Sequence, residues 1–159
     1  MNVKRNCGAS LRAGILAMSL MFAGTTAVQA QEDAEWSVEV RQSVLKLVRW
    51  NMAPMANMAR GRAPLDIEVV ETNSARIEGL FGMMDAAFAN DTRGADVDTD
   101  ALDRIWEERD AFAEKISAAR QVAADLNAAA GTGDEDSVMA GIGALGRSCG
   151  SCHDDYKAD

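Results

Sequence analysis

Five consecutive residues near the C-terminus could do chemistry together: Cys149, Gly150, Ser151, Cys152 and His153. Two cysteines three positions apart, with a histidine directly after the second, are the attachment signature of a c-type haem. On a helix, Cys149 and Cys152 fall on one face, so both thiols can form thioethers with the two vinyl groups of one porphyrin. His153 lies four residues beyond Cys149 and can bind the iron from the same side. It is the only histidine in the sequence.

Two cysteines at this spacing have three other uses. A structural zinc site needs four ligands, and the sequence contains no second Cys/His pair. A dithiol redox motif sits at the start of a helix that follows a strand, and no such strand is indicated here. A plain disulfide between Cys149 and Cys152 is the third alternative. The complete signature favours one covalently bound haem c per chain.

Residues 1–30 have the pattern of a cleaved signal peptide, which predicts export to the periplasm. Basic residues come first, residues 13–22 are apolar, and residues 28–30 are the small-residue cleavage site Val-Gln-Ala. The apolar run is too short to span a membrane. Cleavage would also remove Cys7, so a mature domain of residues 31–159 would keep only the cysteines of the haem signature.

The charge of the chain excludes one class of partner. The formal charge is −9, and loss of the signal peptide changes it to −12, because that peptide has three basic residues and no acidic one. A protein this acidic has no electrostatic surface for nucleic acid. An acidic surface could instead steer the protein toward a basic redox partner.

Apolar residues recur at helical spacing in four stretches, and no segment alternates in the manner of a strand. The predicted helices span residues 36–58, 66–88, 102–130 and 134–156. Four comparable helices with short connections predict an all-α fold, an antiparallel up-down-up-down four-helix bundle. Cys149 and Cys152 continue the apolar stripe of the last helix, which would aim a covalently bound haem into the bundle.

Several other residues in these helices have simple interpretations. Pro54 should kink or interrupt the first helix, because it lacks a backbone donor and clashes with the preceding turn. The tryptophans at 36, 50 and 106 are interpreted as packing residues. Met52 lies on an apolar stripe, where methionine fills a core more often than it binds iron.

An exported four-helix chain with a haem signature in its last dozen residues resembles the cytochrome c′ family, the class II c-type cytochromes. The resemblance covers the mature chain and rests on residues 41–45 (Arg-Gln-Ser-Val-Leu), 62–66, 105–106 and 149–156. It implies that His153 is the proximal iron ligand and that the first helix covers the opposite haem face. Class I cytochromes c resemble the chain poorly, since their signature lies near the N-terminus.

The resemblance also implies roles for three further residues. Leu45 stands where family members with an open sixth position have an apolar residue and where six-coordinate relatives have a methionine ligand. Arg41 matches an arginine that contacts a haem propionate, and an arginine on an apolar stripe does need an anionic partner. Lys157 takes the place of a basic residue near the proximal haem face.

These assignments imply a periplasmic haem protein with a five-coordinate, high-spin iron that binds nitric oxide and carbon monoxide and transfers electrons. The alternative is a six-coordinate, low-spin electron carrier with a methionine such as Met52 as the sixth ligand. No enzyme is expected, because the only histidine is used on the proximal side, although weak peroxidase or nitric oxide reductase activity stays open. Many family members are homodimers, for which Val44 and Leu47 are the candidate contacts.

Overall fold

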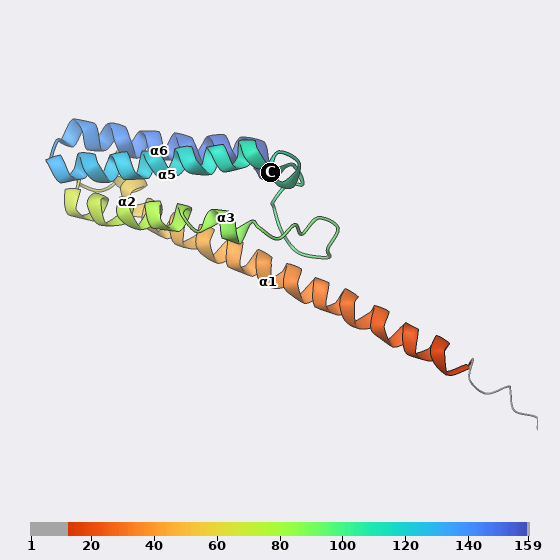
Figure 1. Ribbon diagram of the computed structural model, residues 1–159. Helices are drawn as coiled ribbons and strands as arrows, with labels where there is room; N and C mark the ends of the chain where they lie inside the picture. Colours follow the sequence, from red (N-terminus) through yellow and green to blue (C-terminus); the bar gives the residue numbers. More distant parts are fainter. Residues whose placement is uncertain (1–12, 159) are drawn as a thin grey trace, which may run out of the picture.

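The computed structural model describes residues 13–158, with side chains from residue 27 onward. Four long helices form the bundle: α1 (Ala13–Ala59), α2 (Ile67–Phe81), α5 (Arg109–Thr132) and α6 (Glu135–Tyr156). Two one-turn helices, α3 (Met84–Ala87) and α4 (Arg104–Glu107), lie between α2 and α5. Consecutive long helices run in opposite directions (Figure 1), and no strand occurs among the described residues. The prediction of an all-α, up-down-up-down bundle is confirmed.

Helix α1 begins within the predicted signal peptide. Residues 1–12 of that peptide lie outside the described residues, and its cleavage after Ala30 stays a prediction. The first part of α1 extends beyond the other helices, and its second part packs along α2 (Figure 1). Pro54 lies inside α1 and does not interrupt it, because the buried Met55 and Met58 hold the last turns against the core. Within residues 13–158, no helix has the length and apolar character needed to cross a membrane.

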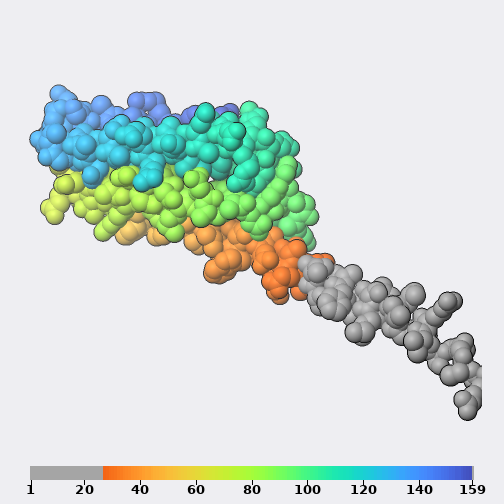
Figure 2. All heavy atoms as spheres, viewed as in Figure 1, coloured from red at the N-terminus to blue at the C-terminus, as the bar shows by residue number. Residues whose placement is uncertain are grey.

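The core lies between the four long helices, each of which contributes fully buried side chains: Met55, Val70, Ile77, Leu126, Ile142 and Leu145. Figure 2 shows the face of the molecule that α2 and α5 form, with α1 along its lower edge. Trp106 is buried, as predicted, and donates its indole N–H to the Phe88 carbonyl at 3.3 Å.

Two predictions about which side chains lie on the outward flank of α1 are wrong. Trp36 and Trp50 are each 66% exposed, so the expectation that they pack in the core is wrong. Val44, the predicted outer contact of a dimer, is buried at 4% exposure, whereas Leu47 is exposed as predicted. The cause is the angular position on the helix: Val44 lies one turn from the buried Val48, whereas the two tryptophans point away from that face.

The second and third predicted helices are each divided. The second predicted helix begins at Asp66 as expected, because the Asp66 carboxylate accepts a hydrogen bond from the backbone N–H of Val69 at 3.1 Å. It is divided because α2 ends at Phe81 and α3 follows as a separate helix. The second break falls at Glu108, between α4 and α5. On one continuous helix Trp106 and Phe112 would point about 120° apart. The break lets both side chains turn into the core.

Gly141 allows α6 to approach α5 closely. A Cβ at this position would lie 2.8 Å from Leu126 Cδ1 and 3.5 Å from Leu126 Cβ, and Leu126 is 1% exposed. We expect Gly141→Ala to lower the free energy of unfolding, because overpacking costs about 1–3 kcal/mol and exceeds the gain of up to about 1 kcal/mol in helix propensity. Urea unfolding measures the difference. Gly79→Ala in α2 is the control, since a Cβ there meets nothing within 4 Å and should stabilise; equal stability of the two variants would contradict the close approach.

Candidate functional site

The last two turns of α6 carry both cysteines and the histidine. Three core residues of this helix, Val138, Ile142 and Leu145, are buried, and the same stripe continues into Cys149. Both thiols are free and half-buried, and His153 is exposed about 40° further around the helix from Cys149. The helix thus presents two sulfur atoms and an imidazole on adjoining parts of one surface.

Burial raises the pKa of the thiols of Cys149 and Cys152. At Cys152 the nearby Lys115 ammonium partly opposes the rise. Both thiols are therefore protonated at neutral pH, whereas a reactive dithiol needs a depressed pKa. In the described part of the chain, no three His, Cys, Asp or Glu side chains gather as a metal-binding group. The zinc, dithiol and disulfide alternatives thus gain no support from the site.

One contact fixes the position of α1 relative to α6. Met52 Cε lies 3.8 Å from the place that a Cβ on Gly146 would occupy. The two helices run in opposite directions (Figure 1), so seven residues back along α1 correspond to seven residues forward along α6. Leu45 is therefore level with His153, about 10 Å along the bundle from the contact between Met52 and Gly146.

Leu45 is 40% exposed, although its neighbours Val44 and Val48 are buried. Seven residues make nearly two helical turns, so Leu45 and Met52 lie on the same flank of α1, the flank that contacts α6. Leu45 thus presents an apolar side chain toward the level of His153 without being part of the packed core.

These residues fit a covalently attached haem. Two free thiols and the adjacent imidazole are the donor set for two thioethers and one iron bond. A Cβ on Gly150, between the cysteines, would meet no atom within 4 Å, so the surface of α6 there is unobstructed. An apolar porphyrin face also matches the half-exposed Leu45 across from it.

Arg41 is only 2% exposed, and its guanidinium is held by the last residue of α3 and by the segment that follows α3. Its Nε donates to the Ala87 carbonyl at 2.8 Å, one terminal nitrogen donates to Thr92 Oγ1 at 2.8 Å, and the other donates to the Asn90 carbonyl. Burial lowers the pKa of Arg41, and the Asp91 carboxylate opposes this. A guanidinium has five N–H groups, so two remain for an anion. Contact with a haem propionate stays a prediction.

Arg41→Met should lower the free energy of unfolding by about 2 kcal/mol or more, because the carbonyls of Ala87 and Asn90 lose a charged donor. The variant also loses the stacking of the guanidinium between the rings of Phe88 and Trp106, whose centroids lie 5.1 and 5.0 Å away. Arg41→Lys should recover part of the loss, since it keeps the charge but not the fork of donors. Thermal unfolding of the three proteins tests this, and a Met variant as stable as the wild type would contradict it.

Lys157 caps the end of α6 and is exposed. Its ammonium lies 3.3 Å from Asp100 Oδ2, and it donates to the Ala158 carbonyl at 2.7 Å. The structure therefore directs this side chain toward the segment before α4. Its place near the proximal haem face stays a prediction.

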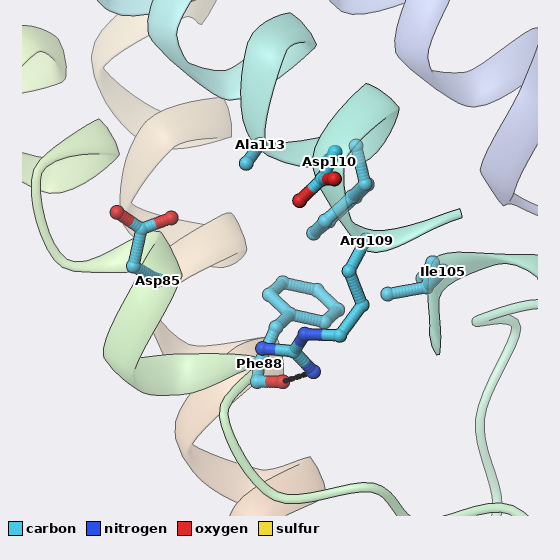
Figure 3. Close-up of a pocket in the computed structure, with 7 residues that line it drawn as sticks. Asp85, Phe88, Ile105, Arg109, Asp110 and Ala113 are labelled. Carbon is cyan, nitrogen blue, oxygen red and sulfur yellow. Dashed lines mark hydrogen bonds between the residues drawn. The ribbon is translucent and has the colours of Figure 1, made fainter. Parts of the chain in front are cut away.

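A cavity of about 140 Å³ lies between α3 and the start of α5 (Figure 3). Its lining includes Asp85, Phe88, Phe112 and Arg109, and Arg109 donates to the Phe88 carbonyl at 3.3 Å. None of the predicted site residues lines this cavity, so it is separate from the site on α6.

One residue that contacts the site has no signal in the sequence. Lys115 of α5 reaches Ser151 and Asp155 of α6, although 36 positions separate it from the first of them. Spacing rules find partners on one helix, and nothing local in the sequence pairs a lysine on one helix with a segment of the next. Only the packing of α5 against α6 shows the contact.

The chain is similar to known proteins in sequence and in fold. The family model described as Cytochrome C' matches residues 37–157. Cytochrome c-554 from Cereibacter sphaeroides is 32% identical over 148 residues, which cover 90% of this chain and 96% of that protein. The structure of cytochrome c prime from Shewanella frigidimarina is similar with a TM-score of 0.72 and 31% identity, over 79% of this chain and 97% of that chain. The nitric oxide complex of a mutant of cytochrome c prime from Alcaligenes xylosoxidans has a TM-score of 0.70 and 32% identity, over 79% of this chain and 96% of that chain.

Proposed function

Because this chain belongs to the cytochrome c′ family, we propose that it is a periplasmic haem protein whose five-coordinate, high-spin iron binds small uncharged gases and also transfers electrons. Haem c is its cofactor, and the chain carries the attachment signature of that group at Cys149 and Cys152. When bound, haem supplies an iron that changes oxidation state and accepts a gas at an axial position.

The thiols of Cys149 and Cys152 would hold the haem through thioethers, and His153 would bind the iron as its axial ligand. Two attachment points on adjacent turns of α6 would fix the orientation of the porphyrin on this helix. Arg41 would donate its two remaining N–H groups to a propionate, and Lys157 would add a positive charge on the proximal side.

The position of Leu45 carries the proposal. Leu45 is level with His153 on the facing flank of α1, and a leucine has no atom that can bind iron. The protein would therefore supply one axial ligand only. The apolar side chain offers no hydrogen bond to an anion, so uncharged diatomic gases such as nitric oxide and carbon monoxide are favoured. The nitric oxide complex of the Alcaligenes relative supports this class of ligand.

The second candidate function is a six-coordinate, low-spin electron carrier with Met52 as the sixth ligand. Met52 is favoured among the methionines because it shares the flank of Leu45. Its contact with Gly146, however, keeps it about 10 Å along the bundle from the level of His153. The five-coordinate iron therefore explains the arrangement better.

We do not propose an enzyme. The only histidine in the sequence is assigned to the proximal side, so no histidine remains to move a proton on the opposite side. Weak peroxidase or nitric oxide reductase activity would then be a side reaction of an accessible iron.

Two kinds of protein partner belong to the proposal. The charge of −9 for the whole chain, more negative after export, favours a redox partner with a basic docking surface. The second partner is another copy of the same chain. One flank of α1 exposes three large apolar side chains, Trp36 at 66%, Leu47 at 48% and Trp50 at 66%, which a second copy could cover. Sedimentation velocity at two salt concentrations would distinguish a homodimer from a monomer.

Electron paramagnetic resonance and resonance Raman spectra of the purified protein test the proposed function. We expect high-spin iron in both oxidation states, binding of carbon monoxide by the ferrous form, and weak binding of anionic ligands by the ferric form. A low-spin ground state with a thioether ligand would replace the five-coordinate assignment by the second candidate.

A further inference from the structure

The ammonium group of Lys115, on α5, is bound to the face of α6 that lies opposite His153. Its Nζ is 2.7 Å from Ser151 Oγ, 3.1 Å from the Ser151 carbonyl oxygen and 2.7 Å from Asp155 Oδ2. A lysine ammonium has three N–H donors, and these three acceptors match them. Lys115 thus joins α5 to two residues one turn apart on α6.

Ser151 and Asp155 stand two positions before and after His153 but lie on the other side of the helix. At 100° a residue, each is about 160° around α6 from His153. Ser151 also lies between the two cysteines of the signature. A contact on this face therefore fixes how far the last turns of α6 rotate about the helix axis, and so where His153 points.

The acceptor carboxylate is itself held by other charges. Asp155 Oδ1 lies 3.7 Å from Arg104 Nη1, and Arg104 Nε lies 2.8 Å from Glu108 Oε2. The bond to Asp155 raises the pKa of Lys115, so the lysine stays charged throughout the neutral range. The side chain of Lys115 is 31% exposed, which leaves most of it shielded by α5 and α6. The cation therefore occupies a defined place beside the haem-attachment segment.

We propose that Lys115 is a positioning residue for the haem: it fixes the rotation of the attachment segment and places one positive charge beside it. The inference rests on haem attachment at Cys149 and Cys152 and on the proposed ligand His153, and not on the number of axial ligands. A nearby positive charge disfavours the ferric iron relative to the ferrous iron, which carries one charge less. Lys115 therefore raises the reduction potential.

Lys115→Met tests this in the purified, haem-loaded protein, because methionine keeps an unbranched stem and removes the charge and all three donors. We expect a lower reduction potential and a shifted iron–histidine stretching frequency in the resonance Raman spectrum of the ferrous form. Lys115→Arg should restore most of the potential, since the charge remains. Arg120→Met is the matched control, because Arg120 also lies on α5 but pairs with Glu78 of α2, at 3.6 Å.

Asp155→Asn provides a second measurement if the Met variant does not accumulate. It removes a negative charge at the same place, so we expect the opposite shift, a higher potential. Potentials of Lys115→Met and Asp155→Asn equal to the wild type would overturn the proposal, and so would an equal shift in Arg120→Met, which would assign the effect to net charge. A low-spin iron in the wild-type protein would overturn the five-coordinate assignment alone, because the comparison of potentials between variants would still stand.

Discussion

The Cys149→Ser/Cys152→Ser protein is expected to lose covalent haem entirely and to unfold at a much lower temperature than the wild type. Serine cannot form a thioether, so neither vinyl group can be joined to the chain. The flank of α1 around Leu45 would then stay open to water. Each 100 Å² of apolar surface kept from water contributes about 2.5 kcal/mol, so loss of a porphyrin from this flank should cost several times that amount. Haem staining after denaturing electrophoresis and a thermal melt followed by circular dichroism measure the two effects.

The appropriate control is Ser148→Ala, which changes the neighbouring residue of α6 and leaves both thiols in place. It should retain the stain and melt near the wild-type temperature. Loss of haem from the wild-type protein in acidic acetone would contradict covalent attachment. A cooperative melt of the double variant at the wild-type temperature would contradict the link between haem and fold.

Leu45→Ala should bind carbon monoxide about tenfold more tightly or faster in the ferrous form. The reason is that a gas must displace the leucine side chain, and a cost of about 1.4 kcal/mol corresponds to a factor of ten in affinity. Leu45→Met should instead yield a low-spin, six-coordinate iron, because a thioether would then stand level with His153. Stopped-flow mixing with carbon monoxide and low-temperature electron paramagnetic resonance measure these outcomes.

Leu47→Ala is the matched control for Leu45, since it removes the same group two residues away on the outward flank of α1, where Leu47 is 48% exposed. It should leave gas binding unchanged. The competing assignment has its own signature. A low-spin wild-type iron that becomes high-spin in Met52→Leu and is unaffected by changes at Leu45 would identify Met52 as the sixth ligand.

The course of the helices could be predicted from the sequence where local chemistry decides it. Asp66 begins α2 through a hydrogen bond to the backbone three residues on, and Gly133 ends α5 because its φ of +76° suits glycine. The breaks before α3 and at Glu108 could not be predicted. Apolar periodicity continues across both breaks. At Glu108 the helices separate because Trp106 and Phe112 must both turn into the same core.

The site residues that share one helix could also be predicted from the sequence, whereas the contacts between helices could not. The spacing of Cys149, Cys152 and His153 predicts their common surface, because all three lie on one helix. The place of Leu45 relative to His153 needed the contact of Met52 with Gly146, which no single stretch of sequence contains. Contacts between helices, such as that of Lys115 with Ser151, depend on how α5 packs on α6, and the spacing of apolar residues along the sequence does not predict them.

The half-exposed position of Leu45 has an evolutionary consequence. The packing of α1 against the other helices is made by Val44 and Val48, so a change at Leu45 leaves these contacts between helices in place. The same change alters the group that meets an incoming ligand. Mutation can therefore change the iron chemistry at this one position while the contacts between the helices are kept. A bundle built in this way can diversify its ligands faster than its core.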